Sequence, residues 1–241
     1  MAKRRKAELV DARGLSPSVR SLLFRTADGS AIGHAAGQYV DIIVPTAGGL
    51  RYKRSYSIAS APDRAHPSLF EVAVTRVEGG PTSEALHALS LGAVVEIEGP
   101  EGSFVRRHDG QHDAPTLFVA AGTGLAPLRA MLAEDNGVLD GPPLVLLFGC
   151  RTPRDILWGD ELRSWAEATP RFSLHVTLSR ATPGWTGLAG HVQRHVHALA
   201  RGLPGARAYV CGLGAMVDDV VQILEGATGL PHESIHHESY D

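Results

Sequence analysis

The sequence predicts a two-domain protein, in which an antiparallel β-barrel is followed by an α/β domain built on a parallel sheet. The length of 241 residues exceeds that of a usual single domain. Short runs that alternate apolar and polar residues fill the first half, whereas buried strands alternate with helices from Pro115 onward. The polar stretch 106–114 is the expected linker, so we place the boundary between residues 110 and 111.

In the first domain, strands are expected where period-two patterns lie between glycines and prolines, as in residues 21–24, 38–44 and 69–75. One helix is expected over residues 83–89, because Leu86 and Leu89 share a face and Ser83 can cap its start. No apolar segment follows the basic tetrad at residues 3–6, so we expect no signal peptide and a cytoplasmic protein. We expect this tetrad to form a frayed, solvated terminus.

In the second domain, apolar runs predict strands, and amphipathic segments predict the helices that cover them. The expected strands are 116–121, 144–149, 172–178 and 208–211, and the expected helices are 125–132, 160–168, 190–200 and 215–224.

The composition excludes several classes of protein. With 44% hydrophobic and 20% charged residues, the chain is close to the average of soluble globular proteins. Its longest uncharged stretch, residues 114–128, is too short for a membrane span, so we expect a soluble protein. Without the basic tetrad, 19 of the 23 basic residues remain against 26 acidic residues, and the resulting charge of −7 disfavours a nucleic-acid partner. Cys150 and Cys211 cannot form a disulfide framework or hold a four-thiolate cluster.

The loop Gly122-Thr123-Gly124 follows a buried strand and opens a helix, which makes it a candidate phosphate-binding loop. Pro127 stands where the common dinucleotide fingerprint has its third glycine, and the next strand ends at Arg151 instead of at an acidic residue. The common dinucleotide fold is therefore disfavoured. Taken alone, the loop fits a tight turn that binds nothing equally well.

A second cluster lies in the first domain, where Arg54, Tyr56 and Ser57 share one strand and Gly80 precedes Ser83. An arginine can bind a phosphate with two donors, and a tyrosine two residues later lies on the same strand face. The helix start near Ser83 also favours an anion. Two phosphate-type sites suggest two nucleotides, although Arg54 alone fits a surface residue and Tyr56 alone fits ordinary β packing.

Together with further motifs, these residues resemble the ferredoxin–NADP reductase-like flavoproteins over nearly the whole chain. The resemblance implies that residues 1–110 form an FAD-binding barrel and that residues 111–241 bind NADP or NAD, with the two ring systems meeting between the domains. It is carried by Gly37-Gln38-Tyr39-Val40, Arg54-x-Tyr56-Ser57, Gly99-Pro100-Glu101-Gly102-Ser103-Phe104, the loop from Gly122 to Pro127, Cys211-Gly212 and Glu238-Ser239-Tyr240.

The resemblance also implies roles for residues at the flavin. Arg54 holds the FAD pyrophosphate, Tyr56 packs on the isoalloxazine, and Ser57 hydrogen-bonds close to its reactive nitrogen. Gly80 and Ser83 complete the pyrophosphate site.

On the nicotinamide side, the resemblance assigns the loop Gly122-Thr123-Gly124, Cys211, Glu238 and Tyr240, with the terminal tyrosine covering the flavin face. We interpret Cys211 and Glu238 as residues that position the nicotinamide and stabilise charge during hydride transfer, neither being a covalent nucleophile. Cys211 as a small buried hydrophobe is the alternative. Asp241, which follows the tyrosine, departs from the family pattern.

The nucleotide preference rests on Ser179 and Arg180, which follow the third strand of the α/β domain. In the family a serine and an arginine there contact the 2′-phosphate of NADPH, and arginine suits a phosphate because its planar fork offers paired donors. Arg151, at the end of the preceding strand where an NAD-binding fold favours an acidic residue, also indicates NADPH. We therefore favour NADP(H) over NAD(H), with Arg180 as a solvated loop charge being the alternative.

Other chemistries lack their motifs. The sequence has no Gly-x-Ser-x-Gly elbow, no Gly-Lys-Ser/Thr phosphate loop and no His-Glu-x-x-His helix. His191 and His195 lie four residues apart, but without a further ligand they fit a solvated helix face. His236 and His237 stay unassigned.

We therefore expect an FAD-dependent NAD(P)H oxidoreductase that passes hydride from NADPH to flavin and electrons on to a separate acceptor, such as a ferredoxin, a flavodoxin or an oxygenase component. A reductase of free flavin or quinone is one alternative. A non-catalytic electron-transfer subunit of a larger complex is the other, because a fold does not by itself establish turnover. The sequence leaves the oligomeric state open.

Overall fold

The computed structural model describes residues 4–45, 51–106, 114–135 and 138–240. The chain divides into two compact units: unit 1 comprises Met1–Arg106 and Arg129–Glu134, and unit 2 comprises Arg107–Leu128 and Asp135–Asp241. The predicted boundary between residues 110 and 111 lies outside the described residues, as does Asp241.

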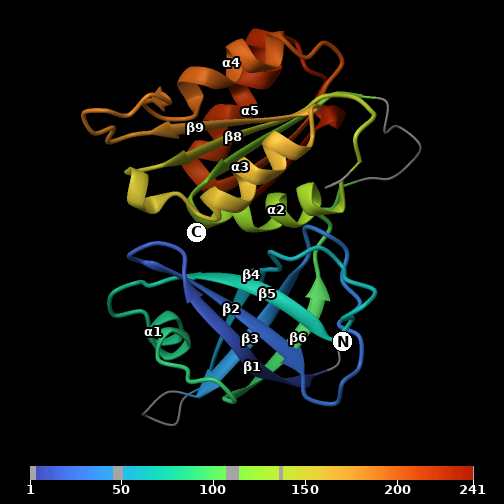
Figure 1. Cartoon of the computed structure of the whole chain (residues 1–241), viewed down its shortest axis with the longest axis vertical. Helices are drawn as coiled ribbons and strands as arrows, with labels where there is room; N and C mark the ends of the chain where they lie inside the picture. Colours follow the sequence, from blue (N-terminus) through green and yellow to red (C-terminus); the bar gives the residue numbers. More distant parts are fainter. Residues whose placement is uncertain (1–3, 46–50, 107–113, 136–137, 241) are drawn as a thin grey trace. The chain divides into compact units, whose positions relative to one another are not determined.

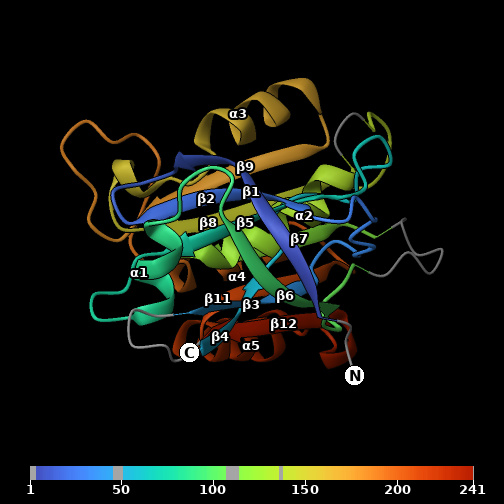
Figure 2. The ribbon, with the colours of Figure 1, turned by 90° about the horizontal axis from the view of Figure 1, so that it is seen from below.

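Unit 1 contains a six-stranded antiparallel sheet in the order β4-β3-β6-β1-β2-β5. An isolated bridge between Ile58 and Val72 joins the segment after β4 to β5, the strand at the other end of this order. The bridge closes the sheet into the expected barrel, whose curved strands are visible in Figures 1 and 2. The strands are β1 (Arg5–Gly14), β2 (Val19–Thr26), β3 (Tyr39–Pro45), β4 (Arg51–Ser57), β5 (Leu69–Thr75) and β6 (Val94–Glu101).

The barrel core is formed by the inward-facing residues of these strands and by one helix. Phe24 and Phe70 stack with their ring centroids 5.6 Å apart. Helix α1 (Pro81–His87) adds Leu86, which is fully buried in the same cluster. The helix begins and ends two residues before the predicted range, because Gly80 is its N-cap and the fixed φ of Pro81 suits the first helical position. The prediction that Ser83 caps the helix is therefore wrong.

The N-terminal segment is part of the barrel. Arg5 pairs with Ile97 of β6, and its Nη1 donates to the carbonyl of Ala31 at 2.8 Å. Nη2 of Arg4 lies 2.7 Å from Oε1 of Glu98. The expectation of a frayed terminus is therefore wrong for residues 4–6, because strand pairing and acidic side chains on β6 hold them in place.

Unit 2 contains a six-stranded parallel sheet in the order β10-β9-β8-β7-β11-β12. The order reverses at β7, from which successive strands extend to either side, and ligands of such sheets bind at the carboxyl ends of the strands at this reversal. The strands are β7 (Thr116–Ala121), β8 (Leu144–Cys150), β9 (Phe172–Leu178), β10 (Leu188–Ala189), β11 (Arg207–Leu213) and β12 (Ile235–Tyr240).

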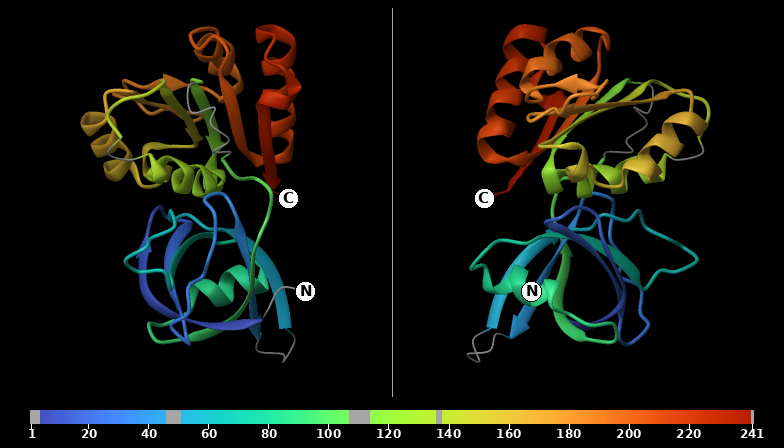
Figure 3. Two further views of the ribbon diagram at one scale, coloured as in Figure 1. Left: turned by 90° about the vertical axis from the view of Figure 1, so that its right-hand side faces the viewer. Right: turned by 60° about the vertical axis from the view of Figure 1, so that its left-hand side comes forward.

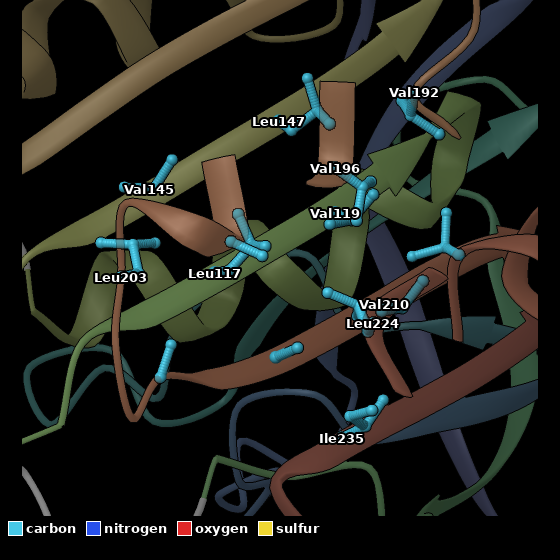
Figure 4. Close-up of a cluster of buried hydrophobic side chains, with 14 of the residues drawn as sticks. Leu117, Val119, Val145, Leu147, Val192, Val196, Leu203, Val210, Leu224 and Ile235 are labelled. Atoms are coloured by element: carbon cyan, nitrogen blue, oxygen red, sulfur yellow. The ribbon is translucent and has the colours of Figure 1, made fainter. Parts of the chain in front are cut away.

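Helices cover both faces of this sheet (Figure 3). One face is packed by α4 (Gln193–Arg201) and α5 (Gly214–Thr228), whose apolar residues form one core cluster with β7, β8, β11 and β12 (Figure 4). Helix α3 (Gly159–Ala168) packs against β9 on the other face. Short 3₁₀ turns, η1 (Gly122–Gly124), η2 (Pro153–Asp155) and η3 (His232–Ser234), connect elements. Helix α2 (Leu125–Glu134) begins in unit 2, and its residues from Arg129 onward belong to unit 1.

The described part of the chain has no helix that is both long enough and apolar enough to cross a membrane.

Candidate functional site

Arg54 and Tyr56 lie on β4, at the edge of the unit 1 sheet. They pair with Ile42 and Val40 of β3, which belong to the barrel core. The Arg54 side chain is exposed, and its Nη1 donates to the carbonyl of Lys53 at 2.9 Å. Burial raises the pKa of Tyr56 to about 12, against the opposing effect of Arg54. The strand therefore presents an exposed guanidinium beside a neutral phenol.

Ser57 ends β4 and is buried. The next amide, that of Ile58, donates to the carbonyl of Gln38 at 2.8 Å, and the Gln38 side chain donates to the carbonyl of Gly102 at 3.1 Å. A Cβ on Gly37 would lie 2.0 Å from the carbonyl oxygen of Phe104, so only glycine fits there. Three of the motifs that carried the family resemblance are thus neighbours within unit 1.

The start of α1 contains the other residues assigned to the pyrophosphate. The Ser83 hydroxyl accepts from the amide of Val77 at 3.1 Å and donates to the carbonyl of Gly80, also at 3.1 Å. Ser83 therefore closes the loop before the helix. Its neighbour Thr82 is 4% exposed, and Thr82 Oγ1 has no hydrogen-bond partner among the described residues.

These residues fit FAD. A buried hydroxyl without a partner costs free energy that a phosphate oxygen would recover, and the guanidinium of Arg54 suits the same group. The flat, apolar body of Tyr56 suits a ring system. Thr82 was not predicted, although its position beside Ser83 in a glycine-rich helix start is a signal that could have identified it.

In unit 2, the loop Gly122–Gly124 follows β7 at the point where the strand order reverses. A Cβ on Gly124 would lie 2.3 Å from the carbonyl oxygen of Cys211 and 2.7 Å from the amide nitrogen of Gly212. Gly122 has a φ of +56° and open space around it. Thr123 between them is half-exposed. The loop therefore lies directly on the end of β11 and keeps one side open for a phosphate.

The parallel pairing of β11 and β12 brings together the residues assigned to the nicotinamide. Cys211 pairs with Glu238, and Leu213 pairs with Tyr240. Burial raises the pKa of the Cys211 thiol to about 12; Glu238 adds to this rise, whereas a hydrogen bond with Tyr240 opposes it. The thiol is therefore neutral at neutral pH, which agrees with a positioning role and not with a covalent nucleophile.

We expect Cys211→Ser and Glu238→Gln each to slow anaerobic reduction of the flavin by NADPH roughly tenfold, equivalent to about 1.4 kcal/mol in the barrier. The oxidised flavin spectrum should stay unchanged, because both residues are assigned to the nicotinamide, whereas the residues assigned to FAD belong to unit 1. Stopped-flow absorbance measures both quantities. Cys150→Ser is the matched control, since that half-buried thiol lies at the end of β8. Wild-type rates in both test variants would make Cys211 and Glu238 structural.

Arg151, Ser179 and Arg180 lie side by side after the ends of β8 and β9. The Ser179 amide donates to the carbonyl of Cys150 at 3.0 Å, and the Arg180 amide donates to the carbonyl of Arg151 at 2.8 Å. Both arginine side chains are exposed, and neither forms an ion pair with another described residue. The structure thus brings together the three residues expected at the 2′-phosphate.

The histidines contribute to packing. His195, expected on a solvated helix face, is half-buried, and its Nε2 lies 3.2 Å from both Thr177 Oγ1 and the carbonyl of Ala189. The ring of His236 lies 4.9 Å from that of Tyr209. Within the described ranges, no group of three or more His, Cys, Asp or Glu side chains could hold a metal ion.

Sequence reasoning also missed Glu71 and Arg129, which form a buried ion pair in unit 1. The signal was available, because Glu71 interrupts an apolar strand and Arg129 interrupts an apolar helix. A charge in the middle of an apolar run indicates a buried partner.

Two family models match the chain in the order of the units. The oxidoreductase FAD-binding domain matches residues 6–105, and the oxidoreductase NAD-binding domain matches residues 118–222. Together they span most of the sequence.

Three similar proteins are described as reductases. Ferredoxin–NADP reductase B of Sorangium cellulosum (strain So ce56) is 46% identical over 242 residues, which cover 98% of this chain and 97% of that protein. The propane 2-monooxygenase reductase component of Gordonia sp. (strain TY-5) is 29% identical over 94% of this chain, which spans only 64% of that protein. The solved structure of the ferredoxin reductase in carbazole 1,9a-dioxygenase matches with a TM-score of 0.84 at 26% identity. The match covers 99% of this chain and 70% of the chain of that reductase.

Both domain matches and the 46% identical relative support one conclusion about family and cofactors. FAD and a nicotinamide dinucleotide are the cofactors of this oxidoreductase. The chain belongs to the ferredoxin–NADP reductase-like flavoproteins, which join an FAD-binding domain to an NAD-binding domain.

Proposed function

We propose that this enzyme oxidises NADPH and passes the electrons through FAD to a separate small redox protein, such as a ferredoxin, a flavodoxin or an oxygenase component. The observation that carries the proposal is the pairing of Cys211 with Glu238 and of Leu213 with Tyr240 on two adjacent strands, together with the close packing of Gly124 against the Cys211 backbone. The ferredoxin–NADP reductase of Sorangium cellulosum and the monooxygenase reductase component support the choice of acceptor.

In the proposed mechanism, residues of each unit have separate tasks. When bound, FAD would supply the capacity to take up two electrons and to release them singly. Arg54 and Thr82 would hold its pyrophosphate, and Tyr56 would pack on its ring system. The amides of the loop Gly122–Gly124 bind the phosphates of the nicotinamide nucleotide. The neutral Cys211 thiol and Glu238 orient the nicotinamide, and Tyr240 excludes water from the ring face.

An absorbance spectrum before and after anaerobic addition of NADPH tests the core of the proposal. The purified protein should be yellow with non-covalent FAD, and NADPH should bleach the flavin band. A colourless protein that also fails to take up added FAD would contradict the proposal.

Steady-state assays with different acceptors separate the alternatives. We expect turnover with a ferredoxin or a flavodoxin to exceed turnover with free flavin or quinone. Turnover confined to free flavin or quinone would identify a reductase that needs no protein partner. Flavin reduction without turnover on any acceptor would identify an electron-transfer subunit.

The nucleotide preference is tested by Arg180→Ala. We expect wild type to prefer NADPH and the variant to lower the ratio of kcat/KM for NADPH over NADH by about 10- to 100-fold, because the lost contact is a charge-assisted hydrogen bond worth about 1.5–3 kcal/mol. Arg201→Ala, which removes an exposed cation from the last turn of α4, should keep the ratio. A preference for NADH, or an unchanged ratio in Arg180→Ala, would show that Arg180 does not bind the 2′-phosphate.

A cytoplasmic location is part of the proposal. Both cysteines are free thiols, the state that thiols keep in reducing compartments.

A further inference from the structure

Glu71 is a buried charge in the middle of β5. Its Oε2 lies 2.9 Å from Nη1 of Arg129, and its Oε1 accepts from the Ser21 hydroxyl at 2.5 Å. Nη2 of Arg13, a half-exposed side chain, lies 3.3 Å from the same Oε1. The side chains of Glu71 and Arg129 are each 9% exposed, so water contributes little to their solvation.

Arg129 makes a second contact, with the backbone that follows the flavin-site strand. The same Nη1 donates to the carbonyl oxygen of Ala59 at 2.7 Å. Ala59 lies two residues after Ser57, the end of β4. Arg129 therefore links the Glu71 carboxylate to the backbone directly after the Arg54-x-Tyr56-Ser57 motif.

Most backbone N–H and C=O groups of the segment 58–60 form hydrogen bonds with residues outside it. The amide of Ala59 donates to the carbonyl of Glu71 at 2.7 Å, and the amide of Glu71 donates to the Ser60 hydroxyl at 3.0 Å. His34 Nε2 lies 2.9 Å from the carbonyl oxygen of Ser60. Among these contacts to the segment 58–60, the contact from Arg129 comes from a charged donor and from the residue most distant in sequence.

Stability alone does not account for an arginine and a glutamate at these positions. Apolar residues of similar volume are often as stabilising as a buried ion pair, since desolvation offsets the attraction between the charges. The pair fixes the orientation of the groups that it contacts, because a planar guanidinium can donate hydrogen bonds to a carboxylate and to a carbonyl at fixed angles.

We propose that Arg129, with Glu71 as its counter-ion, is a positioning residue of the flavin site, which holds the Ala59 carbonyl and thereby sets the position of Ser57. The inference rests on the proposed contact between Ser57 and the flavin. Arg129 lies in α2, the helix that begins at Leu125 directly after the loop Gly122–Gly124.

The test replaces the pair without leaving a buried charge. In Arg129→Met with Glu71→Gln, the glutamine still offers an acceptor to the Ser21 hydroxyl. We expect a folded, FAD-loaded protein in which the visible circular dichroism of the flavin changes and anaerobic reduction by NADPH is about tenfold slower, because small misplacements of positioning groups have large effects on rate.

The matched control is a second buried ion pair, in which Arg171 Nη2 lies 3.1 Å from Asp135 Oδ1 in unit 2. Arg171→Met with Asp135→Asn removes an ion pair that belongs to unit 2, whereas the Arg54-x-Tyr56-Ser57 motif belongs to unit 1. The flavin circular dichroism and the reduction rate should then match wild type, whereas the melting temperature measures how far each double variant is destabilised.

The flavin signal and the rate must change together in the Arg129 variant and stay unchanged in the Arg171 variant; any other pattern overturns the proposal. If the Arg129 double variant does not fold, Arg129→Lys decides, since one ammonium cannot reproduce the planar fork and the same changes are expected at smaller size. If wild type is not reduced by NADPH, the proposed function fails, while the circular dichroism of the FAD-loaded variants still tests the positioning role.

Discussion

Gly124→Ala is expected to leave a yellow, FAD-loaded protein that NADPH reduces at least about 100-fold more slowly than wild type. The added methyl group would lie 2.3 Å from the Cys211 carbonyl oxygen and 2.5 Å from its carbonyl carbon. Both are backbone atoms, so either the loop or the end of β11 must move. Such a movement displaces the amides that bind the phosphates and the strand end that carries Cys211. Stopped-flow absorbance measures the rate, and the flavin spectrum reports on FAD.

Gly226→Ala is the matched control for this substitution. Gly226 lies in α5, and an added Cβ there meets no atom within 4 Å. Alanine in place of a helical glycine stabilises by about 0.5–1 kcal/mol, so this variant should react as fast as wild type. Equal rates for the two variants would show that close packing of the loop on β11 is not required for nucleotide binding.

Arg54→Ala is expected to weaken FAD binding by about 10- to 100-fold, because it removes a charge-assisted phosphate contact worth about 1.5–3 kcal/mol. The Arg54 side chain is exposed on an edge strand, so the fold should tolerate its loss. Titration of the apoprotein with FAD, followed by flavin fluorescence, measures the affinity.

Lys53→Ala provides the control on the same strand. Lys53 points to the opposite face of β4, where its Nζ lies 2.7 Å from Asp41 and 3.2 Å from Glu98. The Lys53 side chain is 53% exposed, and Ser55 still donates a hydrogen bond to the less exposed Asp41 in the variant, so the affinity for FAD should stay at the wild-type value. If Arg54→Ala also retains wild-type affinity, Arg54 is a surface residue and the pyrophosphate binds elsewhere.

Local sequence patterns were sufficient for the fold class. Period-two alternation predicted the antiparallel strands, and buried runs followed by amphipathic segments predicted the parallel sheet. The exact ends of the elements depended on local interactions that the hydrophobic patterns do not report. At α1, the prediction rests on Ser83 as the cap, whereas Gly80 is the N-cap and Pro81 occupies the first helical position. At the N-terminus, the prediction treats a charged tetrad as solvated, although Glu98 of β6 contacts Arg4.

The motifs assigned residues to each nucleotide, because glycine, arginine and serine at fixed spacings carry chemistry that can be read locally, and these assignments stay predictions. Distances between those residues depended on strand pairing. The register that sets Cys211 against Glu238 joins segments far apart in the sequence, and the contact between the ends of β8 and β9 places Arg151 beside Arg180.

The amino-acid sequence was therefore enough to predict the two-domain architecture, the family and its cofactors, since each depends on residue type and short-range order. Long-range packing settled the rest. The orphan hydroxyl of Thr82 and the contact of Arg129 with Glu71 and Ala59 exist only after distant segments meet. The physical reason is that burial turns an ordinary polar residue into one that must find a partner, and the chain topology decides which partner is within reach.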